Sequence, residues 1–430
     1  MSAGYRVKTL MLASGERLPV LLDRAGQPMF DPTVFALTEV RGKNLASNTI
    51  GNVLRAVMAF QLFLDARDID LDARLADGAL LSLGEVEDLT RLCRLRLDDL
   101  AALSGERANA VAAPAPINVT SIEKARMRAQ VVSQAGVDTG VVATRLHYIR
   151  SYLHWLATER LSRHGLDQSV AARLRDAAKR ASDAIESRIP RKSGRAALEQ
   201  REGLSDEDVA ELLRVIDPHS PDNPWRDQHT RYRNALLVHW LLHFGLRIGE
   251  ALGVRNSDIV DYRKEVTIHR RADDPDDPRR EQPQTKTRAR VLPMSVELLA
   301  QTQAYVLTHR AALPEAKKHP FLFVASRTGR PLTVVAAKKL FQELRERCPW
   351  LPKNLSAHLL RHTWNDQFSE QMDAAGVAPE NEKQARSYLM GWSPTSDTAA
   401  AYTRRYVRNK AREVSLALQD QLVNKGKNDE

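Results

Sequence analysis

Apolar residues that recur every three or four positions are the feature of this sequence that most limits the folds available to it. Between residues 48 and 66 this spacing is followed by Ile50, Val53, Leu54, Val57, Phe60 and Leu64. Such a stripe is typical of an amphipathic helix, and Asn48 is the residue type expected at its N-cap. Similar patterns continue to about residue 186, broken by the prolines of residues 112–118. Residues 31–186 are therefore predicted to form a mainly helical domain.

The rest of the chain predicts small β elements and a second helical domain. Residues 1–30 hold two short apolar runs joined by a polar turn, which is typical of a β-hairpin. Residues 187–200 contain Pro190, Gly194 and several bases, and we interpret them as a linker. Ser205 then precedes an acidic first helical turn, and strand-like runs at 264–270 and 289–294 interrupt the later helices. The predicted fold is mainly α with a small antiparallel β-sheet, and the predicted divisions are 1–30, 31–186, 187–200, 201–413 and 414–430.

Composition excludes several classes of protein. No apolar stretch approaches the length of a membrane span, and the N-terminus lacks the apolar core of a signal peptide. Cys93 and Cys348 are the two cysteines of the chain, too few for a disulfide framework, so we expect a cytoplasmic protein. Lys and Arg number 64 against 54 acidic residues, a net charge of +10, which is compatible with a polyanion as partner.

Four clusters in the second domain contain side chains suited to catalysis. They are GLRIGEAL, TKTRARVLPM, HLLRHTW and the stretch from LMGW to AAYTRRYV. In the third cluster the histidine and the arginine lie three residues apart, so they share a helix face. The candidate residues are Arg247, Glu250, Lys286, His358, Arg361, Trp392 and Tyr402.

Each cluster taken alone has an ordinary explanation. Arg247 with Glu250 fits a simple ion pair, His358 with Arg361 fits a polar surface pair, and a tryptophan is more often part of a core than of a binding site. Lys286 lies near Arg288 and Arg290, and three such bases fit a solvated turn. Only the order of all four clusters in one domain favours a shared function.

That order resembles the catalytic domain of the tyrosine recombinases, also called the phage integrase family. The resemblance covers residues from about 201 to 413 and is densest at GLRIGEAL, at TKT with the VLPM strand, and at HLLRHT. It implies a two-domain DNA clamp, in which a helical core-binding domain and the catalytic domain close round a duplex. Residues 31–186 are similar in kind to the core-binding domain, although no motif in them supports the assignment.

The resemblance implies a role for each candidate. Arg247 and Arg361 present guanidinium forks to the nonbridging oxygens of the scissile phosphate. Tyr402 is the nucleophile and forms a 3′-phosphotyrosine, His358 handles its proton, and Lys286 acts as general acid toward the departing 5′-oxygen. No cofactor is expected, and no metal is expected, because the arginine clamp takes the place of metal ions.

Two positions differ from the residues or spacing common in the family. Trp392 stands where most members have a second histidine, and its indole N–H can donate a hydrogen bond but cannot exchange a proton. Tyr402 lies ten residues after Trp392 rather than nine, and Tyr406 is a second candidate nucleophile. The AAYTRR context favours Tyr402. We expect Glu250 to orient a neighbouring cation.

The predicted function is that of a site-specific DNA recombinase or integrase, of the kind that a mobile element encodes as its integrase or transposase. Its partners would be double-stranded DNA with specific recombination sites, further copies of itself in a tetramer on that DNA, and accessory or sister recombinases. No membrane partner is expected, and the site of action would be the nucleoid. A type IB topoisomerase and a non-catalytic DNA-binding protein with this fold are the alternatives.

Two segments outside the motifs leave two interpretations open. The linker is either a solvated connection or a basic strap on the DNA backbone, with Arg188, Arg191, Lys192 and Arg195 as its candidate contacts. The C-terminal helix places Val414, Leu418 and Leu422 on one stripe. This stripe packs either on its own domain or on a neighbouring protomer.

Overall fold

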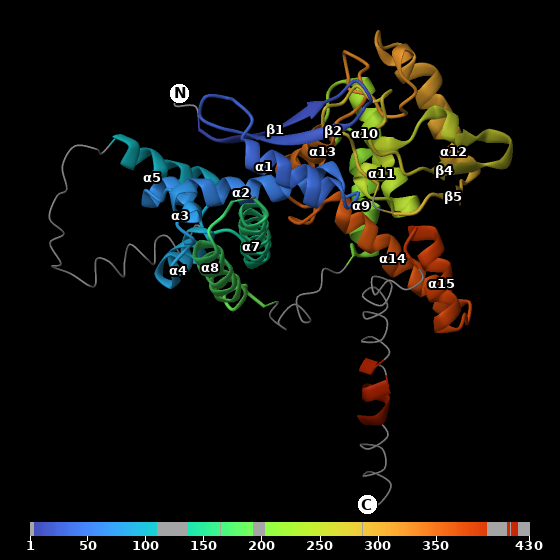
Figure 1. Cartoon of the computed structure of the whole chain (residues 1–430). Coiled ribbons are helices and arrows are strands. Elements are labelled where there is room, and N and C mark those ends of the chain that lie inside the picture. The colour runs from blue at the N-terminus through green and yellow to red at the C-terminus, as the bar shows by residue number, and fades with distance from the viewer. Residues whose placement is uncertain are drawn as a thin grey trace, which may run out of the picture. The chain divides into compact units, whose positions relative to one another are not determined.

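The computed structural model describes residues 4–109, 136–163, 165–191, 203–285, 287–393, 411–412 and 414–419. The chain forms two compact units. The first comprises Met1–Leu12 with Arg17–Ala197, and the second comprises Ala13–Glu16 with Leu198–Glu430 (Figure 1). The division of the chain into a DNA-binding domain at 31–186, a linker and a catalytic domain at 201–413 stays a prediction.

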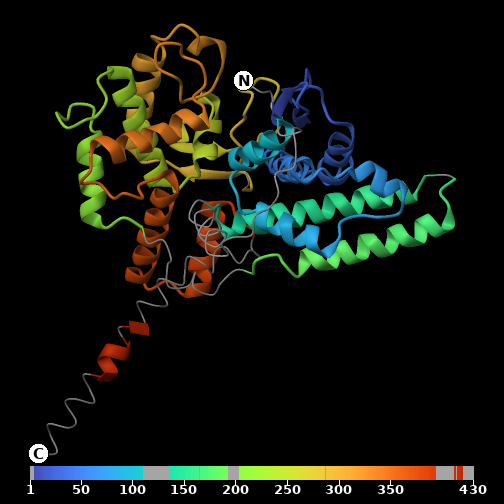
Figure 2. The same cartoon turned by 90° about the vertical axis from the view of Figure 1, so that its left-hand side faces the viewer.

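The first unit is a helical cluster with one β-hairpin. The predicted hairpin is confirmed, because β1 and β2 pair antiparallel from Arg6↔Leu22 to Met11↔Arg17. Helix α2 lies at the centre, against β2, α5 and α7, and α7 and α8 lie side by side (Figure 2). The elements of this unit are β1 (Arg6–Met11), β2 (Arg17–Leu22), α1 (Phe30–Phe35), the π-helical η1 (Ala36–Arg41), α2 (Ser47–Arg67), α3 (Leu71–Ala76), α4 (Leu83–Leu92), α5 (Leu97–Asn109), α7 (Thr139–Leu161) and α8 (Gln168–Glu186).

The apolar stripe of α2 forms the core of this unit. Phe60 and the other apolar residues of the stripe are almost fully buried, and Tyr152 of α7 meets the ring of Phe60 edge-on at 6.4 Å. The predicted N-cap is wrong. Asn48 lies inside the helix, because the extended backbone that precedes a helix is found at Ala46, and backbone conformation decides the cap position.

The second unit is built round one buried helix. Helix α10 packs against α9, α11, α12 and α14, and its Trp240 is fully buried. The elements are α9 (Asp206–Ile216), α10 (Gln228–Phe244), α11 (Ile248–Gly253), η3 (Asn256–Asp258), β3 (Ile259–Val260), η4 (Asp261–Arg263), β4 (Glu265–Ile268), β5 (Arg290–Pro293), α12 (Val296–Ala304), η5 (Tyr305–Arg310), η6 (Ala316–Lys318), α13 (Val334–Arg347), α14 (Ala357–Ala374) and α15 (Pro379–Met390).

The sheet and the helix start of the second unit match their predictions. Strands β3, β4 and β5 form an antiparallel sheet in that order, with Ile268 opposite Arg290. Ser205 caps α9 by accepting a hydrogen bond from the Asp208 amide. None of the helices in the described part of the chain is long and apolar enough to cross a membrane.

The thiol of Cys93 should be unreactive in the folded protein. Cys93 is 1% exposed, and burial raises its pKa to about 12, so the nucleophilic thiolate is scarce at neutral pH. We expect iodoacetamide at pH 8 to leave Cys93 unmodified in the native protein and to alkylate it after unfolding in guanidinium chloride. Peptide mapping by mass spectrometry measures both states. Equal alkylation rates in the two states would contradict the burial.

Candidate active site

The first arginine of the site stands at the start of a short helix. Helix α10 ends at Gly245, whose φ of 57° lies in the left-handed region, and Arg247 is the N-cap of α11. The backbone amide of Arg247 donates to Glu250 Oε2 at 3.1 Å, and its Nη1 lies 3.3 Å from Glu250 Oε1. The Arg247 side chain is 34% exposed, so Glu250 holds its backbone amide and one guanidinium nitrogen while part of the side chain faces solvent.

Glu250 is the point at which three segments of the chain meet. Its side chain is fully buried. Besides Arg247, its oxygens accept a hydrogen bond from Arg290 Nη2 at 2.9 Å and one from Thr287 Oγ1 at 2.7 Å. Arg361 Nη1 lies 3.8 Å from Glu250 Oε2. Helix α11, strand β5 with its preceding turn, and helix α14 thus share one carboxylate.

Glu250 is ionised at neutral pH in spite of its burial. Burial alone raises the pKa of this carboxyl, but the positive charges of Arg290 and Arg361 and the hydrogen bond from Thr287 outweigh that effect, and the pKa is lowered. A buried charge persists only when it is paired and hydrogen-bonded. The negative charge of Glu250 therefore holds the arginines of this cluster close together.

The second arginine of the site is tied to the same turn as the first. Arg361, on α14, is 1% exposed and donates from Nη1 to the Gly245 carbonyl at 2.7 Å. Its guanidinium carbon lies 5.4 Å from the centroid of the Trp392 ring, within the range of a cation–π contact. Arg247 and Arg361, far apart in sequence, are both fixed to the α10–α11 turn and to Glu250.

Two histidines on α14 form a pair. His358 Nε2 and His362 Nε2 are 3.1 Å apart, and their ring centroids are 4.5 Å apart. A hydrogen bond between these nitrogens requires an N–H on one ring and a lone pair on the other. His358 is exposed and His362 is half-buried. Sequence reasoning singled out His358 alone, although the four-residue spacing of the two histidines was a signal for the pair.

Trp392 follows α15 and packs beside the arginine cluster. It is 7% exposed and forms a small apolar group with Met390 and Trp364. The preceding residue, Gly391, has a φ of 66° and accepts a hydrogen bond from the Arg288 amide at 2.9 Å. A Cβ at Gly391 would come within 2.8 Å of the Arg288 carbonyl oxygen. A glycine here lets the end of α15 touch the chain that enters β5.

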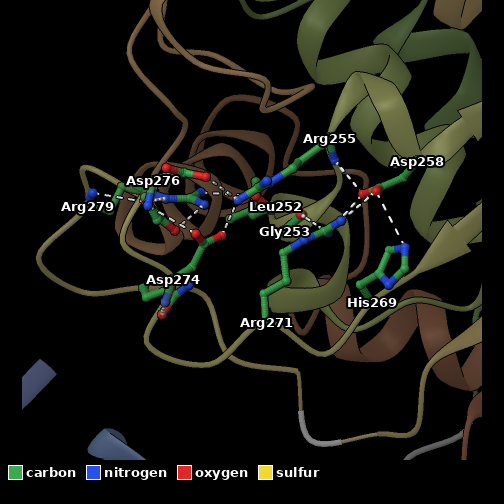
Figure 3. Close-up of polar contacts among 11 residues, drawn as sticks. Leu252, Gly253, Arg255, Asp258, His269, Arg271, Asp274, Asp276 and Arg279 are labelled. Carbon is green, nitrogen blue, oxygen red and sulfur yellow. Dashed lines mark hydrogen bonds and ion pairs between the residues drawn. The ribbon is translucent and has the colours of Figure 1, made fainter. Parts of the chain in front are cut away.

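The long connection between β4 and β5 is anchored on the C-terminal end of α11 (Figure 3). Arg279 is 6% exposed; its Nη1 donates to the carbonyls of Leu252 and Leu332 at 3.0 and 2.8 Å, and its Nε and Nη2 pair with Asp277. Arg271 Nη1 donates to the Gly253 carbonyl at 3.3 Å. Two basic side chains therefore satisfy carbonyls that a helix end leaves without intrahelical partners.

Further ion pairs tie the same connection to the segment after α11. Asp258 pairs with Arg271, while Arg255 pairs with Asp274, and His269 Nε2 lies 3.6 Å from Asp258 (Figure 3). Asp258 and Asp274 are buried. The connection is thus held by paired charges over much of its length.

The connection also passes directly over the start of α11. A Cβ at Gly249 would lie 2.6 Å from the Gln284 carbonyl oxygen, a distance that real Cβ atoms do not adopt. Glycine at this position allows Gln284 to lie against the helix whose N-cap is Arg247. Thr285 and Thr287, on either side of Lys286 in the sequence, are both buried.

The structure brings Arg247, Glu250, Arg361 and Trp392 together, with His358 on the same helix as Arg361. Lys286, Tyr402 and the alternative Tyr406 lie outside the described residues, and their roles stay predictions. Of the linker candidates, Lys192 and Arg195 also lie outside them. Arg191 is exposed, whereas Arg188 pairs with Glu87 at 2.7 Å.

Arg290 is the residue of this cluster that sequence reasoning missed. The sequence allowed a solvated turn of Lys286, Arg288 and Arg290, but the Arg290 side chain is 1% exposed. Burial alternates along β5, so that residues 290 and 292 are buried while 291 and 293 are exposed, but the sequence alone does not show which of the two sets faces inward. The structure turns Arg290 inward, and such a burial requires a buried acid as partner.

The profile of the phage integrase family matches residues 203–408. This part of the chain is therefore a domain of that family, the tyrosine recombinases. No curated protein matches the chain.

Solved structures of recombinases resemble the chain at low sequence identity. The Tn1549 transposon integrase in complex with a circular intermediate DNA is 17% identical, with 74% of this chain and 92% of that chain covered and a TM-score of 0.43. XerA recombinase is 18% identical, with coverages of 72% and 95% and a TM-score of 0.35. XerH bound to a palindromic difH substrate is 16% identical, with coverages of 85% and 96% and a TM-score of 0.41.

Replacing Glu250 by glutamine should destabilise the second unit in a pH-dependent way. The variant leaves Arg290 and Arg361 without their counter-charge, and breaking a buried pair on one side costs about 3–5 kcal/mol. The pKa of Glu250 is lowered, so its stabilisation is present above the ordinary value of 4.5 and is lost as pH falls through the lower folded pKa. Urea unfolding of both proteins across this pH range measures the difference.

The matched control is Glu315→Gln, which removes the carboxylate of a surface pair with Arg330. An exposed pair contributes about 0–1 kcal/mol, so this variant should unfold almost like the wild type. A Glu250→Gln effect that is equally small, or that does not change with pH, would show that the carboxylate is not the centre of the cluster.

Proposed function

We propose that this chain is a site-specific DNA recombinase that cuts and rejoins strands through a 3′-phosphotyrosine at Tyr402. The observation that carries the proposal is the pair of arginines held on one turn and one buried carboxylate, in a domain of the phage integrase family. Two guanidiniums fixed in this way suit a phosphate on which negative charge increases during the reaction.

The chemistry follows from the residue types. The phenol of Tyr402, with a free pKa of about 10, attacks the phosphorus after losing its proton, and the 5′-oxygen of the next nucleotide departs. His358, whose ring can pass a proton to His362 across 3.1 Å, handles the phenol proton, and Lys286 protonates the departing oxygen. The phosphotyrosine bond conserves the energy of the phosphodiester, so another 5′-hydroxyl can reverse the step without ATP.

Arg247 and Arg361 stabilise the transition state. One well-aimed donor is worth about 3 kcal/mol to such a reaction, and neither arginine needs to reorganise, because each is held by a hydrogen bond or ion pair already. Trp392 packs on Arg361 and supplies an indole N–H for phosphate contact. No metal ion takes part in the proposed step.

Recombination joins two duplexes, so the proposal includes a tetramer on two copies of a specific site. Val414 and Leu418 are each 55% exposed, which favours a partner protomer for the C-terminal stripe, whose third residue, Leu422, lies outside the described residues. Arg191, Lys192 and Arg195 of the linker would contact the DNA backbone, while Arg188 is engaged with Glu87. A mobile element is the proposed source, the nucleoid the proposed place of action, and a sister recombinase or accessory protein a further partner.

Replacing Tyr402 by phenylalanine should abolish the covalent intermediate and leave DNA binding intact. The substrate is a duplex recovered from a random-sequence pool by binding to the wild-type protein, with a nick that traps the adduct. We expect a protease-sensitive DNA shift from the wild type in excess EDTA, and the same from Tyr406→Phe, the matched control. An adduct in Tyr402→Phe, or peptide mapping of the phosphate to Tyr406, would overturn the assignment, and dependence on added magnesium would overturn the metal-free mechanism.

The two alternatives give different outcomes with the same protein. A type IB topoisomerase would form the adduct and relax supercoiled plasmid as a monomer, without paired sites. A DNA-binding protein without catalytic activity would bind the selected duplex but form no adduct.

Replacing Arg247 by alanine should affect chemistry far more than binding. The side chain is partly exposed, so its loss is tolerated by the fold, while the transition state loses one donor. We expect single-turnover cleavage to fall by about 100-fold or more, with little change in the affinity for the selected duplex. Cleavage near the wild-type rate would show that Arg247 does not contact the reacting phosphate.

A further inference from the structure

Arg290 occupies a position that links the whole site, although it contacts neither DNA nor substrate in any assigned role. From the first residue of β5 its guanidinium reaches three different segments. Nη2 donates to Glu250 Oε2 at 2.9 Å, Nη1 donates to Thr287 Oγ1 at 3.1 Å, and Nε donates to the Leu389 carbonyl at 2.5 Å. These partners belong to α11, to the turn before β5 and to the last turn of α15.

The geometry points to Arg290 as a positioning residue that fixes the turn containing Lys286 for its work as general acid. This inference rests on the proposed function, which supplies the role of Lys286. It adds that the turn is set in place by the protein itself, through Arg290, rather than by contact with DNA.

The turn is held from one side by the hydroxyl of Thr287. Thr287, the residue after Lys286, is 5% exposed, and its hydroxyl donates to Glu250 Oε1 at 2.7 Å while accepting from Arg290 at 3.1 Å. A threonine hydroxyl with one partner as donor and one as acceptor has a fixed orientation. The backbone immediately beside Lys286 is therefore tied to the carboxylate that also holds both phosphate-binding arginines.

The other side of the turn is fixed as well. The Gln284 carbonyl lies against Gly249 of α11, and Arg279 anchors the earlier part of the connection to the α11 carbonyls. A flexible hairpin would need none of these contacts. The connection has buried, paired charges instead, which cost conformational entropy and desolvation to form.

The turn before β5 is also joined to the segment that leads to Trp392. Arg290 donates to the Leu389 carbonyl and the Arg288 amide donates to the Gly391 carbonyl, so two hydrogen bonds connect this turn to the end of α15. A displacement of about 1 Å in a reacting group costs about 100-fold in rate, and these bonds oppose such a displacement of the turn.

The test uses a leaving group that needs no general acid. In a duplex with sulfur in place of the bridging 5′-oxygen, the P–S bond breaks as the tyrosine oxygen attacks, and the electron pair leaves on sulfur as a thiolate. Thiols have pKa values near 8.5, far below those of alcohols, so the thiolate departs without a proton. A defect in the general acid is therefore visible with oxygen and absent with sulfur.

We expect Arg290→Met to cleave the oxygen substrate about 100-fold more slowly than the wild type, the scale of a lost general acid, and to recover most of that rate on the sulfur substrate. Thr287→Val, which keeps the side-chain shape and removes the hydroxyl, should show the same pattern in a smaller degree. It also keeps the test informative if the Arg290 variant fails to fold. Lys286→Ala provides the reference pattern.

The matched control is Arg310→Met. Arg310 is also buried and donates to three backbone carbonyls, those of Ala316, His319 and Phe321, but it contacts no residue of the site. Its ratio of sulfur to oxygen cleavage should equal that of the wild type.

The outcomes separate this inference from the function on which it rests. If the wild type forms no adduct with either substrate, the proposed recombinase chemistry fails. If the wild type reacts but Arg290→Met and Thr287→Val lose the same factor on both substrates, Arg290 does not position the general acid.

Discussion

The pairing of one buried carboxylate with arginines is the interaction on which the second unit depends. Glu250 lowers the electrostatic cost of bringing Arg247, Arg290 and Arg361 together, since like charges at such distances repel strongly in a medium of low dielectric constant. The cost of burying Glu250 is in turn offset by Arg290 and Arg361, whose charges favour the ionised carboxylate. Neither the acid nor the bases would be stable in these positions without the other.

Local pattern was enough to predict most elements of the fold. Apolar residues at every third or fourth position located α2, and the acidic turn after Ser205 located the start of α9. The strands at 264–270 and 289–294 were found within two residues at each end. Asn48 shows the limit of such reasoning: the path of the backbone sets the N-cap position, and here it selects Ala46, whose side chain makes no capping hydrogen bond.

The candidate site could be predicted only where its residues lie close together in the sequence. Arg247 with Glu250, and His358 with Arg361, are pairs three positions apart, so the sequence itself shows that their members lie close together. Arg290 could not be recognised, because the sequence does not show whether an arginine on a strand points inward or outward. Its partners, at positions 250, 287 and 389, are up to a hundred positions away, and single-sequence reasoning has no access to contacts of that range.

Helix α11 has six residues, and a helix of that length has almost no stability of its own in water. Its persistence depends on Glu250 at one end and on Arg271 and Arg279 at the other. The backbone amides of α11 should therefore exchange with deuterium only when one of these ends opens. Their protection in the DNA-free protein would report directly how much of the proposed arginine clamp is already assembled in the absence of DNA.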